Sequence, residues 1–122
     1  MRGIAGWFVL GATLVSSAHA FAAGDAAAGK TAFENQCASC HSTEPGVNMT
    51  GPSLAGIFGR KAGSFPSFHR YSDALKLSGI VWDDQTLDAW LRNPAALVPG
   101  NEMPFPGIPD ANARIHGLPH PG

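Results

Sequence analysis

Apolar residues recur at helical spacing after Asp25, in the stretch GDAAAGKTAFENQC. Gly29, Phe33 and Cys37 are four residues apart, which places them on one face of a helix. Asp25 is suited to cap that helix, and the pattern continues to about Cys40. The stretch therefore predicts a first helix whose packing face includes a glycine that would let a second helix approach closely.

A second helical pattern follows Asp83 in DDQTLDAWLRN, which ends at a proline. It stacks Leu87, Trp90 and Leu91 on one face, as expected for a helix that covers a core. Ser72 is suited to cap a shorter helix in SDALKLS.

Turn-forming residues dominate the chain between these helices. The segment TGPSLAGIFGRKAGSFPSF, residues 50–68, contains four glycines and two prolines and predicts a wrapping loop. No stretch shows the sustained alternation that a sheet requires. We therefore expect an all-α fold in which short helices and long loops enclose a cofactor.

Residues 1–20 have the layout of a secretory signal peptide. Arg2 precedes an apolar run over residues 4–15, and the stretch ends in Ala-His-Ala. The apolar run is too short to span a bilayer comfortably, although an uncleaved membrane anchor is the alternative. Cleavage is expected after Ala20, with positions up to 23 also suitable. We therefore expect a periplasmic protein with no stable membrane insertion after cleavage.

Charge narrows the function classes further. Without Arg2 the chain has seven basic and nine acidic residues, so the exported protein is mildly acidic. A nucleic-acid binder would need a basic patch, and none is present in the sequence. The exported part is also so small that a covalent cross-link or a bound metal would add to the stability that its hydrophobic core supplies.

The sequence contains two cysteines, and both lie in CASCH, residues 37–41. A disulfide or a redox pair is an alternative in an oxidising compartment, but a thioredoxin-like pair should follow a strand, and none is predicted here. A structural zinc site would need a second pair of ligands, and there is no second C-x-x-C. The pattern favours covalent haem attachment through Cys37 and Cys40, with His41 close enough to bind the iron.

Methionine is the usual second axial ligand in electron-transfer cytochromes. Met49 is too close to His41 in sequence to reach the opposite face of a haem easily. Met103 lies in VPGNEMPFPG, where several prolines reduce the entropy lost when a thioether is held in place. Core filling is the ordinary role of a lone methionine, but this loop favours a ligand.

Four blocks of the chain together resemble class I cytochromes c of the mitochondrial cytochrome c and bacterial cytochrome c2 type. They are GDAAAGKTAFENQCASCHSTEPG, TGPSLAGIFGRKAG, YSDALKLSGIVWDDQTLDAWLRNP and VPGNEMPFPGI, within residues 24–110. The resemblance implies one haem c bound through Cys37 and Cys40, with His41 and Met103 as axial ligands. It also implies a cytochrome c domain over residues 21–110.

The same resemblance implies roles for further residues around the haem. Pro52 matches the proline whose carbonyl accepts a hydrogen bond from the axial histidine. Arg60, Tyr71 and Trp82 match residues that hydrogen-bond the haem propionates, although Arg60 could instead be a solvated charge and Trp82 an ordinary core residue. Trp90 matches an aromatic residue beside the methionine ligand.

The resemblance implies a soluble, monomeric one-electron carrier rather than an enzyme. Its expected partners are a quinol-oxidising cytochrome complex and a terminal oxidase, reductase or photosynthetic reaction centre. Mitochondrial members carry a ring of lysines around the haem edge, whereas here Ala95, Ala96 and Glu102 take such places. We therefore expect a docking face that depends less on charge. The alternative function is an open-site haem protein with peroxidase-like or gas-sensing activity.

The end of the chain departs from the family. Members continue into a long C-terminal helix that crosses the first helix, but this sequence ends IHGLPHPG, in which the glycine and prolines forbid a helix. Residues 111–122 are therefore expected to form an atypical, disordered tail, leaving the face of Gly29 and Phe33 without a partner. A shifted reading frame near Arg114 is a further hypothesis, because codons read one base later permit Ser-Met-Ala-Tyr-Leu-Thr.

Overall fold

The computed structural model describes residues 26–114, together with residues 3, 6, 11 and 12. The expected signal peptide over residues 1–20, with its cleavage site up to 23, lies almost wholly outside the described residues. Within the described part of the chain, no helix is long and apolar enough to cross a membrane.

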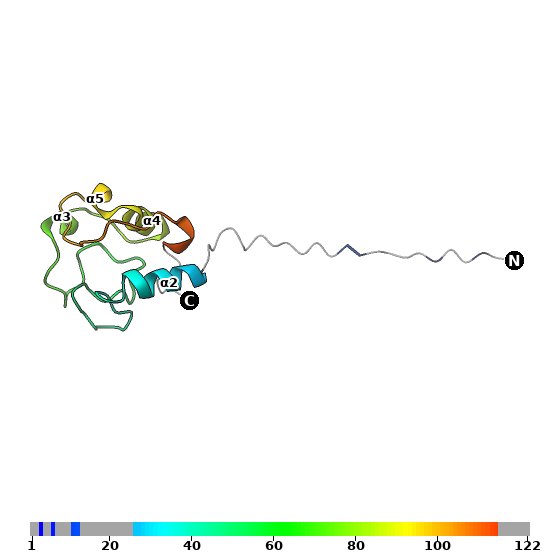
Figure 1. The fold of residues 1–122 in the computed structure, drawn as a ribbon, viewed down its shortest axis with the longest axis horizontal. Helices are drawn as coiled ribbons and strands as arrows, with labels where there is room; N and C mark the ends of the chain where they lie inside the picture. Colours follow the sequence, from blue (N-terminus) through cyan, green and yellow to red (C-terminus); the bar gives the residue numbers. More distant parts are fainter. Residues whose placement is uncertain (1–2, 4–5, 7–10, 13–25, 115–122) are drawn as a thin grey trace.

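Short helices joined by long loops make up residues 26–114 (Figure 1). They contain no β-strand apart from an isolated antiparallel bridge between Lys61 and Val81, so the expected all-α fold is confirmed. The elements are α2 (Ala26–Gln36), α3 (Asp73–Lys76), α4 (Asp84–Arg92), α5 (Pro94–Leu97) and the 3-10 turn η1 (Ala111–Ala113).

Local capping explains where α3 and α4 begin. The backbone N–H of Thr86 donates to the Asp83 carboxylate at 2.8 Å, and the Asp83 N–H donates to the Thr86 hydroxyl at 2.8 Å. This capping box satisfies two backbone donors that a helix start would otherwise leave unpaired. The Leu75 N–H donates to the Ser72 hydroxyl at 3.1 Å, so both predicted caps are confirmed.

Helix α2 ends at Gln36, earlier than the sequence pattern suggests. The Phe33 carbonyl accepts hydrogen bonds from the N–H groups of both Cys37 and Ala38, each at 2.9 Å, and this shared acceptor ends the regular ladder. The next residues form a tight turn in which the Cys37 carbonyl accepts from Cys40 at 3.0 Å. The two cysteines therefore lie on a turn rather than on the helix.

The main core lies beside α4. It is formed by buried residues from the wrapping loop, from the segment just before α4, from α4 itself and from the segment after it: Ile57, Ala62, Trp82, Leu87, Trp90, Leu91 and Val98. Phe33 of α2 packs against this cluster, so the expectation that its face would have no partner is wrong for Phe33. In Figure 1, α2 and the loop after it lie on one side of the molecule, and α3, α4 and α5 lie on the other.

The packed domain continues to Arg114 rather than ending at residue 110. Turn η1 contacts α2, and Ala113 forms a second cluster with Ala32 and Ile108. Ala113 and Arg114 are 8% and 7% exposed. Residues 111–114 therefore belong to the packed domain and not to the expected tail over 111–122, because the small side chains of Ala32 and Ala113 let this turn approach α2 closely. Residues 115–122 lie outside the described residues, and the reading-frame hypothesis stays a prediction.

Candidate functional site

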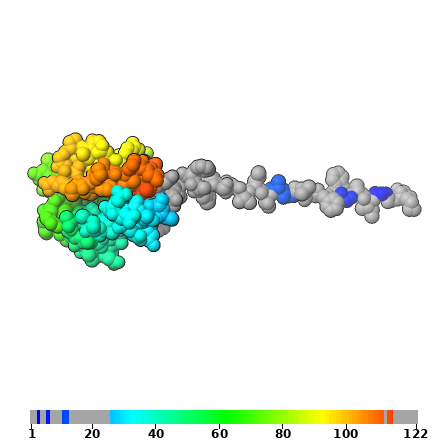
Figure 2. Space-filling view, in the orientation of Figure 1, coloured from blue at the N-terminus to red at the C-terminus, as the bar shows by residue number. Residues whose placement is uncertain are grey.

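A cavity of about 480 Å³ lies between the two halves of the molecule. In Figure 2 these halves meet, the orange and yellow segments against the cyan and green ones. It gathers residues from α2, the wrapping loop, α4 and the loop after α5. All of the residues predicted from sequence to serve the site line it: Cys37, Cys40, His41, Pro52, Arg60, Tyr71, Trp82, Trp90 and Met103. The structure therefore brings together the whole predicted set, which spans much of the chain.

His41 is held in one orientation by the backbone beside it. Its Nδ1 donates to the Pro52 carbonyl at 2.8 Å, as the resemblance implied. Burial lowers the pKa of His41, and the Pro52 carbonyl acts in the opposite direction. The ring is therefore neutral at pH 7, with its proton on Nδ1 and a lone pair on Nε2. Such a nitrogen is suited to bind a metal.

Gly51 makes room for the His41 ring. A Cβ atom at this position would overlap the imidazole, although the backbone conformation at Gly51 is ordinary. The Gly51 N–H also donates to the Cys40 carbonyl at 2.8 Å, which fixes the loop against the cysteine turn. Glycine is therefore needed at this position because the His41 ring leaves no space for a side chain, and not because the backbone adopts a positive φ.

Substituting Gly51→Ala is expected to displace the His41 ring and break its hydrogen bond to Pro52. Overpacking of this kind costs about 1–3 kcal/mol, so we expect a lower midpoint of thermal unfolding and a lower yield of haem-loaded protein. Thr50→Ala is the matched control, because Thr50 is the exposed neighbour. If the two variants gave the same amount of haem-loaded protein and the same midpoint of thermal unfolding, the loop would accommodate the extra methyl group without loss of stability.

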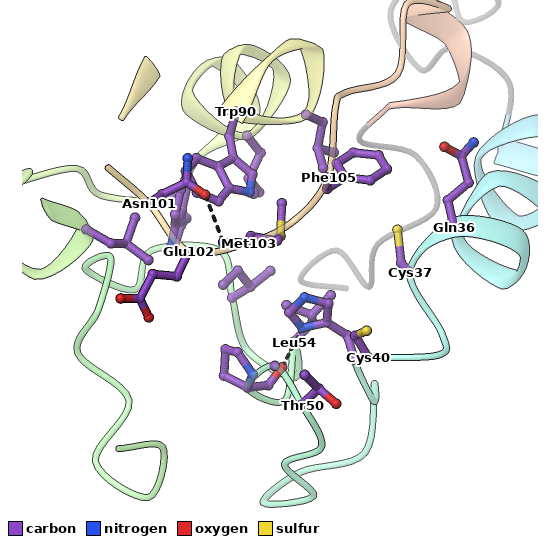
Figure 3. Close-up of a pocket in the computed structure, with 18 of the residues that line it drawn as sticks. Gln36, Cys37, Cys40, Thr50, Leu54, Trp90, Asn101, Glu102, Met103 and Phe105 are labelled. Atoms are coloured by element: carbon purple, nitrogen blue, oxygen red, sulfur yellow. Dashed lines mark hydrogen bonds between the residues drawn. The ribbon is translucent and has the colours of Figure 1, made fainter. Parts of the chain in front are cut away.

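The cysteine turn presents both thiols to the cavity. Cys37 and Cys40 are partly buried and are free thiols. Burial raises the pKa of the Cys37 thiol, and the neighbouring Cys40 raises it further. Figure 3 shows both sulfur atoms on the side of the cavity where α2 ends, with Met103 coming from the opposite wall.

Met103 reaches the cavity from a loop that hydrogen bonds hold in shape. Its N–H donates to the Asn101 side-chain oxygen at 2.9 Å, and the Asn101 amide donates to the Val98 carbonyl at 3.0 Å. The Phe105 N–H then donates to the Met103 carbonyl at 2.8 Å. Met103 also packs against the main core, and its thioether is thus presented by a preorganised loop.

Arg60 and Tyr71 form a polar end of the otherwise apolar cavity. The Arg60 guanidinium donates to the Ala55 carbonyl at 2.8 Å and lies 4.7 Å from the centre of the Phe65 ring. Burial raises the pKa of Tyr71, while hydrogen bonds to the Phe65 backbone and to Arg60 act in the opposite direction. Both side chains are hydrogen-bond donors suited to a carboxylate group.

Trp82 and Trp90 form the aromatic wall of the cavity. Their rings pack edge to face with centroids 5.4 Å apart, and both are buried. This arrangement is favourable for an aromatic pair and holds both rings in one orientation. Trp82 is therefore both a core residue and part of the cavity wall, and its hydrogen bond to a haem propionate stays a prediction.

Two arginines that line the cavity were not predicted. Arg70 donates to the Met49 carbonyl at 2.7 Å and to the Thr50 carbonyl at 3.2 Å, which joins two loops below the cavity. Arg114 also lines the cavity and is buried. No local pattern indicates either role, because the partners of Arg70 and the carboxylate partner of Arg114, Asp88, lie 20 or more residues away in the sequence.

The donor set fits a covalently attached haem. Two thiols can each add to a vinyl group, the histidine nitrogen and the methionine sulfur are suited to the two axial positions, and the walls are apolar. The overlap of a Gly51 Cβ with the His41 ring also shows that the loop is shaped around a histidine held at this position.

Comparisons with known proteins agree with this donor set. The cytochrome c family profile matches residues 26–114. The chain is 47% identical over 110 residues to cytochrome c2 of Rhodomicrobium vannielii, covering 87% of this chain and 84% of that protein. It is 46% identical over 92 residues to cytochrome c of Euglena viridis, covering 75% and 89%.

A solved structure is similar as well. Cytochrome cH from Methylobacterium extorquens superposes with a TM-score of 0.66 and is 49% identical. The match covers 72% of this chain and 87% of that one.

Proposed function

The chain belongs to the cytochrome c family, and from that premise we propose that it is a periplasmic one-electron carrier with His/Met axial ligation. Members of this family carry electrons on a covalently attached haem c, and this chain is a haem c protein of that kind. The periplasmic location is supported by the layout of residues 1–20.

One observation carries the assignment of residues. Both thiols, the free nitrogen of His41 and the thioether of Met103 meet in a single apolar cavity although they come from separate loops. We assign Cys37 and Cys40 to haem attachment, and His41 and Met103 to the two axial positions. Apolar side chains, among them Leu54, Trp82 and Trp90, make up much of the wall around these groups.

Each residue contributes a distinct property to the site. The bound haem supplies an iron that takes up or releases one electron. Pro52 keeps the proton of His41 on Nδ1, so that Nε2 faces the cavity as a lone pair. Trp82 and Trp90 exclude water, which favours the less charged state of a buried centre. Arg60 and Tyr71 compensate carboxylates that would be costly to bury alone.

The direct test is expression together with the haem-attachment machinery, followed by a haem stain and an optical spectrum. We expect stained protein with a low-spin spectrum and a methionine-to-iron charge-transfer band at the red edge of the visible range. High-spin features or ready binding of carbon monoxide by the wild-type protein would instead support the open-site alternative. The position of Met103 in the cavity favours the carrier.

The exposed residues at the cavity suggest the chemistry of the docking partner. The exposed residues that line the cavity are the uncharged Gln36, Ser39, Thr50 and Pro104, the cations Lys61 and Arg70, and the carboxylate Glu102. The adjoining loop exposes Val47 and Met49 by 48% and 40%. We propose a monomeric carrier that docks on quinol-oxidising complexes and on oxidases, reductases or reaction centres through a face on which no one sign of charge dominates.

This docking face predicts a weak dependence of electron-transfer rate on salt. Oxidation by ferricyanide and by the cationic tris(phenanthroline)cobalt(III) should each change less than about threefold between low and moderate ionic strength, whereas strong steering changes rates by about 10-fold or more. Glu102→Lys places a positive charge at the cavity, so the rate of oxidation by the anion ferricyanide should fall more steeply with salt. Glu34→Lys is the control, because Glu34 lies on α2 and does not line the cavity. A large salt effect in the wild type would contradict the proposed face.

A further inference from the structure

Arg114 is a charged residue in an unusual position. Its side chain is 7% exposed, and its Nε donates to an Asp88 carboxylate oxygen at 2.6 Å. Its Nη1 donates to the Pro109 carbonyl at 3.1 Å and to the Ile108 carbonyl at 3.3 Å. A buried guanidinium is costly unless it is paired, so these partners are required for the arrangement to exist.

The contacts of Arg114 join three separate parts of the fold. Asp88 lies on α4, whereas Ile108 and Pro109 lie on the segment that follows Met103. Arg114 itself directly follows η1, which packs on α2, the helix that leads to the cysteine turn. The guanidinium therefore connects the two sides of the cavity behind the methionine loop.

The segment after Met103 is held against α4 at the same place. The Ile108 N–H donates to the Leu91 carbonyl at 2.7 Å. A Cβ atom at Gly107 would overlap the Arg92 carbonyl, so the backbone of this segment lies directly on the helix. The upstream end of the loop is held separately, through the hydrogen bonds of Asn101. Arg114 therefore serves the downstream end.

We propose that Arg114, neutralised by Asp88, is a positioning residue that holds Met103 in its ligand position. The two carbonyls accept from the guanidinium only while the segment lies against α4, so detachment of the loop leaves a buried charge with fewer partners. This inference rests on the proposed role of Met103 as an axial ligand.

The structure provides a matched control on the same carboxylate. Arg92 donates to the other Asp88 oxygen at 3.0 Å, but its side chain is 63% exposed and contacts solvent. Exposed pairs of this kind contribute little to stability. Arg92→Gln therefore removes the same charge from the same partner without touching the methionine loop.

The test compares haem-loaded Arg114→Gln, Asp88→Asn and Arg92→Gln with the wild type, well below their unfolding temperatures. Arg114→Gln and Asp88→Asn should raise the equilibrium constant for Met103 detachment about 10- to 100-fold. The readouts are loss of the methionine-to-iron band, binding of carbon monoxide by the reduced protein, and faster hydrogen exchange at the Ile108 amide. Far-UV circular dichroism and the haem stain should stay unchanged, and Arg92→Gln should match the wild type.

Two results would overturn the proposal. One is a full methionine-to-iron band in folded Arg114→Gln and Asp88→Asn. The other is a loss of the band that occurs only together with a loss of the far-UV circular dichroism signal, because Arg114 would then support the fold as a whole and not the position of Met103. If Arg114→Gln does not accumulate as folded protein, Arg114→Lys is tested in its place by the same criteria. Lysine keeps the positive charge but cannot donate from several nitrogens as the guanidinium does. A wild type without the band would instead overturn the proposed ligand role of Met103.

Discussion

Replacing both cysteines, Cys37→Ala with Cys40→Ala, is expected to abolish covalent haem attachment. No other cysteine exists in the sequence, so no second thiol can form the link. The measurement is a haem stain after denaturing electrophoresis of protein made with the attachment machinery. Ser39→Ala, which changes the exposed residue between them, is the control and should stain like the wild type. If the double variant still stained for haem, the haem would be attached to the protein through residues other than these cysteines.

The same double variant is expected to lose most of its folded structure. The cavity measures about 480 Å³, and an unfilled cavity costs about 24 cal/mol per Å³, or at most roughly 12 kcal/mol here. That cost is comparable with the whole stability of a small domain, about 5–15 kcal/mol. Far-UV circular dichroism should therefore show little helix. A cooperative thermal transition near that of the haem-loaded protein would contradict this expectation.

Met103→Ala is expected to convert the carrier into an open-site protein that keeps its haem. The thioether is the donor that faces His41 across the cavity, and methionine favours the reduced state of the iron. We expect loss of the methionine-to-iron band, a lower reduction potential and binding of carbon monoxide by the reduced protein. The measurements are optical spectra and a redox titration.

Met49→Ala is the control for this substitution. Met49 is 40% exposed and does not line the cavity, so its removal should leave the spectrum and the potential unchanged. A Met103→Ala protein that keeps the band would exclude Met103 as the ligand. Loss of the band in Met49→Ala instead would transfer the role to that residue.

Short-range rules predicted several elements correctly, and for identifiable reasons. Asp83 and Ser72 cap helices through hydrogen bonds to residues three positions further on, so the pattern is complete within one turn. The spacing of Cys37, Cys40 and His41 is local in the same way. The end of α2 was predicted too late, since the acceptor shared by Cys37 and Ala38 leaves no mark in residue type.

The other cavity residues, Pro52, Arg60, Tyr71, Trp82 and Trp90, were predicted through the resemblance and not through local spacing. Pro52 illustrates the difference, because its carbonyl reaches His41 only after the intervening loop folds back. Any residue type other than proline also has a carbonyl, so the side chain at this position does not reveal the hydrogen bond. The roles of such residues depend on where the backbone passes.

The sequence by itself determined the spacing of the two cysteines and the histidine, the caps at Ser72 and Asp83, and the all-α class, because each depends on residues within a few positions of one another. The tertiary structure alone decided how residues 111–114 are used. Arg114 was expected to belong to a tail, yet it pairs with Asp88 and donates to the segment after Met103. Its role depends on burial and on a partner 26 residues away, and neither can be deduced before the chain has folded.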